Sequence, residues 1–224
     1  MNNAVVVLSG GQDSATCAAW AKTWCQEIVC VTFNYKQRHA SRELKAATDI
    51  AKLVGAKRHL IVDVPALAGN PMSGLTNDRI AVGDVDAMSG LPKSFVPGRN
   101  LVFLTSAASI ALSLGISDIV TGVCQTDYSG YPDCREDTIQ VLERAIRLGN
   151  RGVPGADAFR IHTPLMRMTK AESVHFAESL PLGMKAVGLS WTCYEGGEKP
   201  CQVCPACVLR VKGFHDAGVA DPAL

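Results

Sequence analysis

The sequence predicts an α/β fold in which a doubly wound, mainly parallel sheet carries a small cysteine-rich segment at its C-terminal end. Three observations support this prediction: short aliphatic runs alternate with helix-like segments, a glycine turn follows the first run, and four cysteines gather near the C-terminus. Continuous aliphatic runs are typical of strands that helices cover on both faces. We expect residues 1–188 to form the main domain and residues 189–224 a small segment packed on it.

Four aliphatic runs are predicted to be buried strands, and they span residues 4–8, 27–33, 57–62 and 117–123. Because helical segments alternate with these runs, the connections are expected to cross over the sheet and the strands to be parallel. Residues 63–98 differ, since they are rich in proline, glycine, aspartate and asparagine and show little periodicity. A loop of this length inside a compact domain is expected to be functional or partly disordered.

Three segments have apolar residues at helical spacing, together with residue types that start and stop helices. The predicted helices are residues 41–54 with Ser41 as cap and Gly55 as stop, residues 101–115 with Asn100 before and Gly115 at the end, and residues 133–149 with Asp133 as cap, Glu136 three residues on and Gly149 as stop.

The composition is that of an ordinary globular protein: 224 residues, of which 47% are hydrophobic and 19% charged, with a formal net charge of +1. This charge gives no reason to expect a nucleic-acid partner. No apolar run reaches the roughly 18 residues that would suggest a membrane span. Strand-like residues begin at Ala4, so the N-terminus does not read as a signal peptide. We therefore expect a cytoplasmic protein without a membrane or nucleic-acid partner.

The stretch SGGQDS, residues 9–14, follows the first predicted strand and opens a helix, at the edge of a parallel sheet where ligands bind. Gly10 and Gly11 let a phosphate approach the backbone, while Ser9, Ser14 and the first helical amides donate to its oxygens. The lysine of a Walker A loop and the G-x-G-x-x-G dinucleotide pattern are both missing. Taken alone, the glycine pair is better explained as a tight strand–helix turn.

The complete string resembles the pyrophosphate loop, SGGxDS, of the PP-loop ATP pyrophosphatases. The resemblance implies a Rossmann-like fold and ATP cleaved between its α and β phosphates, with AMP transferred to an oxygen of the substrate. Asp13 would hold Mg²⁺, which prefers carboxylate oxygens beside phosphates. The residues expected to bind ATP are Leu8, Ser9, Gly10, Gly11, Gln12, Asp13, Ser14, Ala15, Thr16, Cys17 and Ala18.

Four of the nine cysteines form a C-x₇-C-x₂-C-x₂-C pattern: Cys193, Cys201, Cys204 and Cys207. Four thiolates satisfy tetrahedral Zn²⁺ without leaving an open position, so the pattern predicts a closed, structural zinc site. An iron–sulfur cluster also takes four cysteines, although the bacterial ferredoxin run spaces its fourth cysteine differently. Redox cysteines that transfer sulfur are a third interpretation.

The glycine loop and the cysteine pattern occur together with four further stretches, namely FNYKQRH (33–39), PGRN (97–100), TGVCQTDYSGYPDCR (121–135) and TPLMRMTKAE (163–172). Together these resemble the 7-cyano-7-deazaguanine synthases, nitrile-forming enzymes of queuosine precursor synthesis, over essentially the whole chain. The resemblance implies that ATP, 7-carboxy-7-deazaguanine and ammonia are the substrates and that the protein is a homodimer. One departure is Lys36, where the family more often has glycine, which concerns the local backbone.

A carboxylate is a poor electrophile without a leaving group, so ATP is needed to convert it into an acyl-adenylate that ammonia attacks. A second adenylation would turn the amide into a nitrile. The sequence leaves open whether the products are AMP with pyrophosphate or ADP with phosphate, and the loop resemblance favours the former. The rival enzyme class adenylates a tRNA base for thiolation or lysidine formation, and a zinc-knuckle binding protein without chemistry is a further alternative.

Catalytic roles are expected for Asp13, Lys170 and Arg99. Lys170 follows Thr169 and precedes Glu172 in a capping-box pattern. A cation at the first helical position opposes the helix dipole, a conflict that would be relieved if Lys170 faced the ATP phosphates. Arg99 is expected to bind a phosphate or the substrate carboxylate, the alternative being a solvated residue beside a helix cap.

The predicted ligand edge also carries the residues expected to hold the substrate ring by stacking and hydrogen bonds. These are Gln125, Asp127, Tyr128, Tyr131, Asp133 and Arg135, of which Asp133 is equally explained as a helix cap. Cys134 is a candidate nucleophile for the activated carboxyl, or an ordinary buried cysteine. His39 is a candidate base or phosphate ligand.

Overall fold

The computed structural model describes residues 2–126 and 130–224. Its centre is a five-stranded sheet with the order β3-β2-β1-β4-β5, in which every pairing is parallel. The strands are β1 (Asn3–Val7), β2 (Glu27–Asn34), β3 (Arg58–Asp63), β4 (Asp118–Val120) and β5 (Arg160–His162). The predicted doubly wound parallel sheet is therefore confirmed. Strand β5 was not predicted, because only three residues pair and a single one of them, Ile161, is buried.

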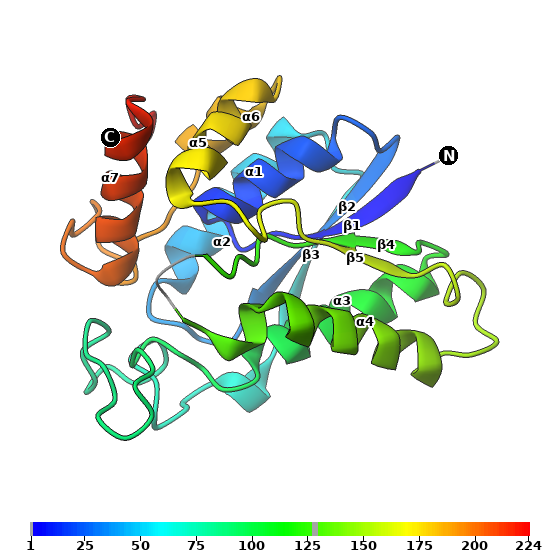
Figure 1. The fold of residues 1–224 in the computed structure, drawn as a ribbon, viewed down its shortest axis with the longest axis horizontal. Helices are drawn as coiled ribbons and strands as arrows, with labels where there is room; N and C mark the ends of the chain where they lie inside the picture. Colours follow the sequence, from blue (N-terminus) through cyan, green and yellow to red (C-terminus); the bar gives the residue numbers. More distant parts are fainter. Residues whose placement is uncertain (1, 127–129) are drawn as a thin grey trace.

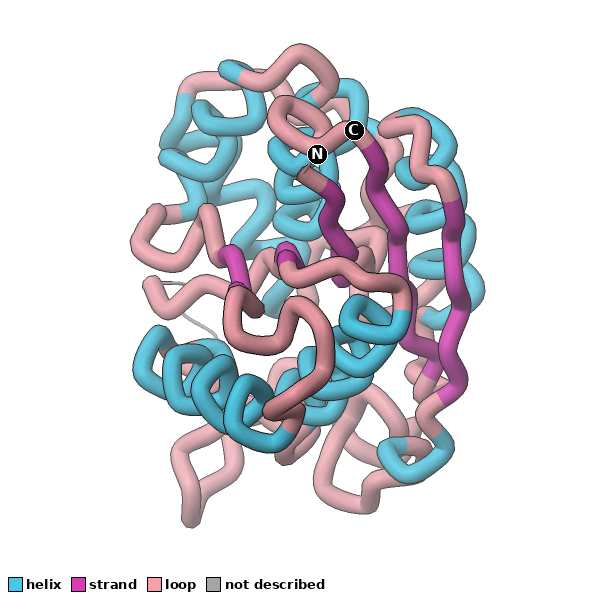
Figure 2. The backbone as a smooth tube through the Cα atoms, turned by 90° about the vertical axis from the view of Figure 1, so that its right-hand side faces the viewer, coloured by secondary structure: helices cyan, strands magenta, loops and turns pink. Residues whose placement is uncertain are grey.

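Helices cover both faces of the sheet (Figures 1 and 2). One face carries α1 (Gln12–Ala21), α2 (Ala40–Leu53), α5 (Lys170–Ser179) and α6 (Gly183–Gly188), and the other carries α3 (Arg99–Ser113) and α4 (Glu136–Gly149). Helix α7 (Pro205–Ala217) lies beyond the carboxyl ends of the strands, and short 3₁₀ turns occur at Pro65–Leu67 and Pro132–Cys134. Among the described residues, none of the helices combines the length and hydrophobicity needed to cross a bilayer.

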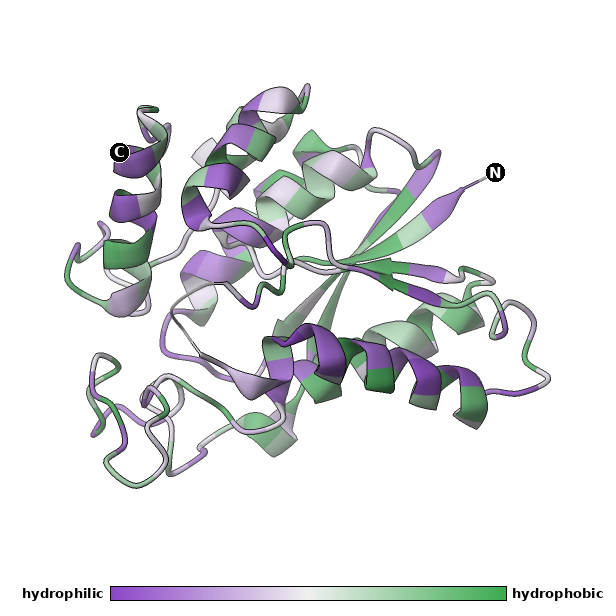
Figure 3. Cartoon of the chain, in the orientation of Figure 1, coloured by the Kyte–Doolittle hydropathy of each residue, from purple (hydrophilic) through white to green (hydrophobic). Residues whose placement is uncertain are grey.

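The core consists of two apolar layers, one on each face of the sheet. Successive side chains of a strand point to opposite faces, so Val5 of β1 packs toward α3 and α4 while its neighbours Ala4 and Val6 pack toward α1 and α2. The central strands β1, β2 and β4 are accordingly mostly hydrophobic, whereas α4 shows alternating hydrophobic and hydrophilic stripes (Figure 3). The aliphatic runs that form β1, β2 and β4 are thus covered on both faces, whereas the prediction of a buried strand is wrong for β3, an edge strand whose Ile61 is 52% exposed.

Two of the predicted helix ends are confirmed and rest on glycine. Gly55 and Gly115 follow α2 and α3 with φ values of +65° and +71°, in the left-handed conformation that favours glycine at a helix C-terminus. The predicted stop at Gly149 is the last residue of α4 itself.

The three predicted helix starts are wrong, and for α3 and α4 the cause is a contact with another segment. Helix α2 begins at Ala40 with His39 at its N-cap, so Ser41 is already helical. Helix α3 begins at Arg99, and its Asn100 amide donates to the Asp133 carboxylate at 3.0 Å. Asp133 therefore caps α3 and not α4, the helix that follows it in the sequence.

Helix α4 begins at Glu136 because the 3₁₀ turn at Pro132–Cys134 separates Asp133 from it. The Glu136 amide donates instead to the Gln125 side chain at 3.3 Å. Side chains distant in the sequence thus satisfy amides that the sequence pattern assigned to local caps.

The C-terminal segment is fastened by a buried ion pair. The Arg210 guanidinium of α7 contacts both carboxylate oxygens of Asp221 at 2.6 and 2.8 Å, and it also donates to Ser190 and Thr192. Both charged side chains are less than a tenth exposed. The expected division into domains 1–188 and 189–224 stays a prediction, and this segment contributes Cys193, Cys204 and Cys207 to the same apolar cluster as the sheet.

Replacing Arg210 with Met is expected to lower the free energy of unfolding by about 3–5 kcal/mol, because Asp221 would keep a buried charge without its partner. Urea denaturation measures this loss. The matched control is Lys212→Met on the same helix, where the ion pair with Asp216 is exposed and the expected change stays within about 0.5 kcal/mol. Equal losses in the two variants would contradict the anchoring role of Arg210.

Candidate active site

The glycine loop lies at the point where the direction of winding reverses. Strands β1 and β4 are neighbours, but the chain leaves β1 toward one edge of the sheet and β4 toward the other. Crevices of this kind, at the carboxyl ends of the strands, are where open α/β sheets bind ligands. The loops after these two strands touch: a Cβ on Gly122 would lie 2.9 Å from the carbonyl carbon of Asp13. Only glycine permits this approach.

Residues 9–11 form a tight turn that leads into α1 and is held by contacts with α2 and the C-terminal segment. Gly10 has φ +87°, and a Cβ there would lie 2.5 Å from the Glu43 carbonyl oxygen in α2. Its own carbonyl accepts the Trp191 amide at 2.8 Å, which ties the loop to the C-terminal segment. Ser9 donates to the Ser14 hydroxyl at 3.1 Å, and no side chain caps α1 at Gly11. The first amides of α1 and its positive dipole end thus remain available to an anion.

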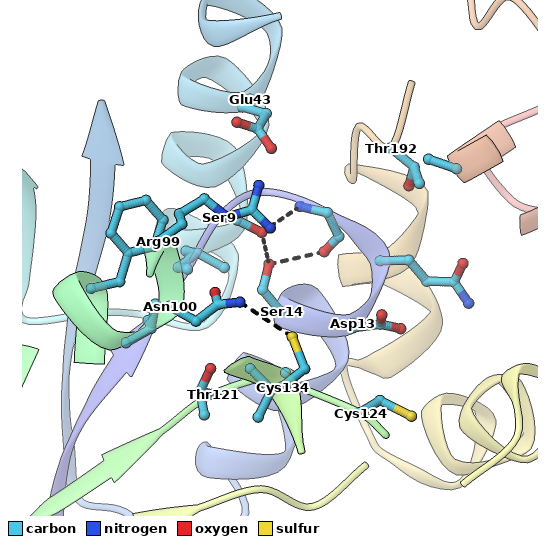
Figure 4. Close-up of a pocket in the computed structure, with 18 of the residues that line it drawn as sticks. Ser9, Asp13, Ser14, Glu43, Arg99, Asn100, Thr121, Cys124, Cys134 and Thr192 are labelled. Carbon is cyan, nitrogen blue, oxygen red and sulfur yellow. Dashed lines mark hydrogen bonds between the residues drawn. The ribbon is translucent and has the colours of Figure 1, made fainter. Parts of the chain in front are cut away.

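A cavity of about 260 Å³ opens above this loop. Its lining includes most of the residues predicted from the sequence to bind ATP or to act in catalysis: Leu8, Ser9, Gly11, Gln12, Asp13, Ser14, Arg99, Lys170 and the predicted substrate residue Tyr131. Figure 4 shows that strands, helices and the C-terminal segment all contribute to it. Gly10, Ala15, Thr16, Cys17 and Ala18 lie outside the lining, and the last four are buried in α1. Asp127 and Tyr128 fall outside the described residues.

Asp13 and Lys170 form an ion pair that joins the starts of α1 and α5. The Lys170 ammonium lies 2.9 and 2.8 Å from the two Asp13 carboxylate oxygens. The predicted capping box around Lys170 is confirmed, with Thr169 and Glu172 bonded to each other's amides. The cation at this helix start is thus stabilised by a carboxylate from the glycine loop, which resolves the conflict with the dipole that the sequence raised.

The aliphatic part of the Lys170 side chain packs on Gly213 of α7, and its ammonium group extends from there to Asp13. A Cβ on Gly213 would lie 2.3 Å from Lys170 Cγ and 3.0 Å from its Cβ. Gly213 is buried in the middle of its helix, where glycine is otherwise unfavourable. The absence of a side chain here lets α5 and α7 approach and guides the lysine into the cavity.

Arg99 lies among tyrosines rather than in solvent. Its guanidinium donates to the Tyr35 hydroxyl at 3.2 Å and lies over the rings of Tyr35 and Tyr131. Burial alone would lower the pKa of Arg99, but the phenol groups of Tyr35, Tyr131 and Tyr194 raise it above its usual value. The alternative of a solvated residue is therefore wrong, and Arg99 brings a fixed positive charge to the cavity.

The predicted substrate residues make bonds within the protein. Tyr131 shares a hydrogen bond of 2.7 Å with Ser94 of the long loop, and Asp133 and Gln125 hold the helix starts described above. Arg135 is exposed at the N-cap of α4. These contacts fix the side chains of Gln125, Tyr131 and Asp133, and substrate contact by the predicted residues stays a prediction.

Cys134 lines the cavity but is not prepared for nucleophilic attack. Burial and the neighbouring Asp133 raise the pKa of its thiol to about 12, and its sulfur accepts a hydrogen bond from Asn100 at 3.2 Å. Since the thiolate is the reactive form, the interpretation as an ordinary, largely buried cysteine is favoured.

Several residues of the cavity were not singled out from the sequence: Tyr35, Glu43, Phe103, Trp191, Thr192 and Tyr194. Tyr35 directly follows β2, so its place at the carboxyl end of a parallel strand is a signal that could have identified it. No sequence signal marks the other residues, because helix packing and the return of the C-terminal segment bring them to the cavity. His39, the candidate base, lies 3.3 Å from Glu43.

Lys36 has φ +58°, in the left-handed region that favours glycine. Its amide donates to the Asn34 side chain at 3.2 Å, which supports the turn after β2. The preference for glycine that the resemblance implies at this position therefore has a backbone cause, and lysine adopts the same turn here at a modest energetic penalty.

The four C-terminal cysteines converge on one point, with their sulfur atoms all within 4.8 Å of one another. Tetrahedral coordination with metal–sulfur bonds of about 2.3 Å requires sulfur atoms about 3.8 Å apart. Amides of Glu195 and Cys201 donate to the Cys193 sulfur, and the Cys204 amide donates to the Cys201 sulfur. Burial alone would raise the pKa of Cys201, but the Cys204 and Val203 amides bring it down to about 7, whereas burial raises the pKa of Cys204 and Cys207. The donor set fits a thiolate-bound metal such as zinc.

Among solved structures, a predicted subunit of a tRNA methyltransferase from Methanocaldococcus jannaschii aligns with a TM-score of 0.50 at 18% identity. The alignment covers 80% of this chain and 75% of that chain. At this identity the likeness concerns the fold alone. Together with the strand order, it places the protein in the doubly wound α/β class.

Sequence comparison defines the family. Residues 3–218 match the family described as queuosine biosynthesis protein QueC. A 7-cyano-7-deazaguanine synthase of Laribacter hongkongensis is 48% identical over 223 residues, covering 99% of this chain and 94% of that protein. Another from Gloeobacter violaceus is 45% identical, covering 99% and 95% respectively. The chain belongs to the QueC family of queuosine biosynthesis enzymes, which confirms the resemblance found in its motifs.

Replacing Gly213 with Ala is expected to reduce turnover in the synthase reaction of the family by about 10- to 100-fold, because the new methyl group displaces Lys170 from Asp13. The measurement is a double-mutant cycle with Lys170→Met. If Gly213 acts through Lys170, Gly213→Ala should lower turnover little further in the Lys170→Met background.

The control is Gly149→Ala at the end of α4, where a Cβ meets nothing within 4 Å and turnover should stay unchanged. Alanine is the better helix former, so helix propensity does not explain a loss. The same fold-loss in both lysine backgrounds would refute the positioning role.

Proposed function

We propose that this protein is a 7-cyano-7-deazaguanine synthase, which uses ATP to convert 7-carboxy-7-deazaguanine and ammonia into the 7-cyano compound. The proposal is supported by membership of the QueC family and by full-length relatives that carry this name. The structural observation that supports it most directly is the cavity in which a glycine loop, an open helix start and the Asp13–Lys170 pair meet.

ATP meets a chemical need of this reaction. A carboxylate has no leaving group, so adenylation of its oxygen makes the carbon open to attack by ammonia and releases AMP with the amide. A second adenylation, on the amide oxygen, then allows loss of that oxygen and leaves the nitrile. The loop SGGQDS supports cleavage between the α and β phosphates, with AMP and pyrophosphate as products.

In this proposal the residues that line the cavity divide the work. The loop from Ser9 to Ser14 and the start of α1 bind the phosphates, and Asp13 is the ligand for Mg²⁺. Lys170 then turns from Asp13 to the phosphates. The movement is short because Asp13, which Lys170 contacts, belongs to the segment that binds the phosphates. Arg99 holds the carboxylate of the acid or a phosphate with its permanent charge.

The ring of the substrate would lie beside the loop after β4. Tyr131, on which Arg99 stacks, borders the cavity and supports this placement. The remaining residues proposed for substrate contact are Gln125, Asp127, Tyr128, Asp133 and Arg135. We further propose that the protein is a cytoplasmic homodimer, since its thiol-rich composition suits a reducing compartment and the resemblance implies the dimer.

Incubation with 7-carboxy-7-deazaguanine, ATP and ammonium is expected to give a product whose mass equals that of the nitrile, together with AMP and pyrophosphate. Mass spectrometry identifies the product, and the Lys170→Met variant should make it at least about tenfold more slowly. Without turnover of the acid the proposed function fails. ATP consumption that depends on added tRNA would favour the rival class that adenylates a tRNA base.

The cysteine cluster is proposed to hold one structural Zn²⁺. Purified protein should contain about one zinc per chain, and Cys204→Ser should lose metal and melt at a lower temperature, because thiolate coordination contributes to folding. Elemental analysis and thermal denaturation measure both effects. Cys124→Ser, outside the cluster, is the control and should retain the metal. Iron and the visible absorption of an iron–sulfur cluster would contradict zinc.

A further inference from the structure

One acid of the cavity has no role in the proposed function. Glu43 lies in the first turn of α2, lines the cavity, and has a side chain only 16% exposed. Figure 4 shows its carboxylate extending from α2 toward Arg99 and the interior of the cavity. A buried carboxylate needs hydrogen-bond donors, so its partners reveal what it is prepared to bind.

Two neighbouring side chains contact the Glu43 carboxylate. Gln37 Nε2 donates to Glu43 Oε2 at 2.6 Å, and His39 Nε2 lies 3.3 Å from Oε1. The amide of Gln37 is oriented by its other end, since its oxygen accepts the Tyr35 backbone amide at 3.1 Å. A carboxylate offers about four acceptor positions, so each oxygen keeps capacity beyond its one partner in the described part of the chain.

Glu43 is held in its charged form. Burial alone would raise its pKa, but His39 and the Gln37 amide bring the pKa below its usual value. Among the described residues no ion pair joins it to Arg99, whose guanidinium donates to Tyr35 and lies over the Tyr131 ring, although the Arg99 charge contributes to the lowered pKa of Glu43. The Glu43 carboxylate and the Arg99 guanidinium thus line the same cavity, and the described residues show no direct ion pair between them.

We infer that Glu43 is a specificity-determining residue that binds the N–H edge of the deazaguanine ring, and this inference rests on the proposed function. The 2-amino-4-oxo ring presents two adjacent donors on one edge, the ring N–H and the amino group, which suit the two oxygens of one carboxylate. The adenine edge of ATP presents a donor beside an acceptor nitrogen, which a carboxylate repels. The aromatic lining from Phe33, Tyr35 and Phe103 suits a flat ring.

The principal test is Glu43→Gln, a change of nearly equal size that removes the charge and places an amide N–H₂ against the ring donors. The KM for 7-carboxy-7-deazaguanine should rise by about 10- to 100-fold, with the KM for ATP within about twofold of the original. The matched control is Glu27→Gln at the opposite end of β2, where the glutamate is exposed and pairs with Lys57; neither KM should change.

A substrate analogue without the 2-amino group tests the same contact on the unchanged protein, so the result does not depend on folding of a variant. The original enzyme should bind this analogue about tenfold more weakly than the acid, whereas Glu43→Gln should hardly distinguish the two. An unchanged KM for the acid in the variant, or equal affinity of the original enzyme for both compounds, would overturn the inference.

A rise in the KM for ATP that disappears with 2′-deoxy-ATP would also overturn it, since Glu43 would then bind the ribose. Calorimetric binding of the acid separates this inference from the proposed function. If the original enzyme binds the acid and the variant does not, but no nitrile forms, the recognition stands and the proposed function fails. If nitrile forms equally well with both proteins, the proposed function stands and the role of Glu43 fails.

Discussion

The ion pair between Asp13 and Lys170 is the contact on which the site depends. It joins the starts of two helices that are 157 positions apart in the chain, and it brings the only cation of α5's first turn to the glycine loop. The pair is possible because Gly213 leaves room for the lysine stem, and α7 is held in place by the buried Arg210–Asp221 pair. The C-terminal segment thereby becomes a wall of the site.

This arrangement explains why a cysteine-rich tail and a nucleotide-type loop occur in one short chain. The tail reaches the loop directly, since the Trp191 amide donates to the Gly10 carbonyl. It also reaches the segment after β2, where a Cβ on Gly196 would lie 2.9 Å from His39 Cα. A metal held by the four thiolates would fix these contacts from outside the cavity, where it takes no part in chemistry.

Each charged group of the cavity has its own partners within the protein. Asp13 forms an ion pair with Lys170. Glu43 is bonded to Gln37 and lies beside His39, and Arg99 contacts phenol groups. A ligand with a carboxylate, a flat ring and a donor edge can therefore meet complementary groups without breaking a direct ion pair between Arg99 and Glu43. Gly10 packs closely on α2 and Gly122 on the start of α1, approaches that only glycine permits.

The sequence by itself determined the features that depend on local pattern: four of the five strands, the parallel sheet, the glycine loop, the cysteine ligand set, the capping box at Thr169 and the family. It failed at helix starts such as Asn100, and it did not reveal Glu43, Trp191 or Gly213. Those depend on contacts between distant segments, where a carboxylate from one loop caps another helix and a missing methyl group admits a lysine. Periodicity and spacing encode the first kind of information, and only tertiary packing decides the second.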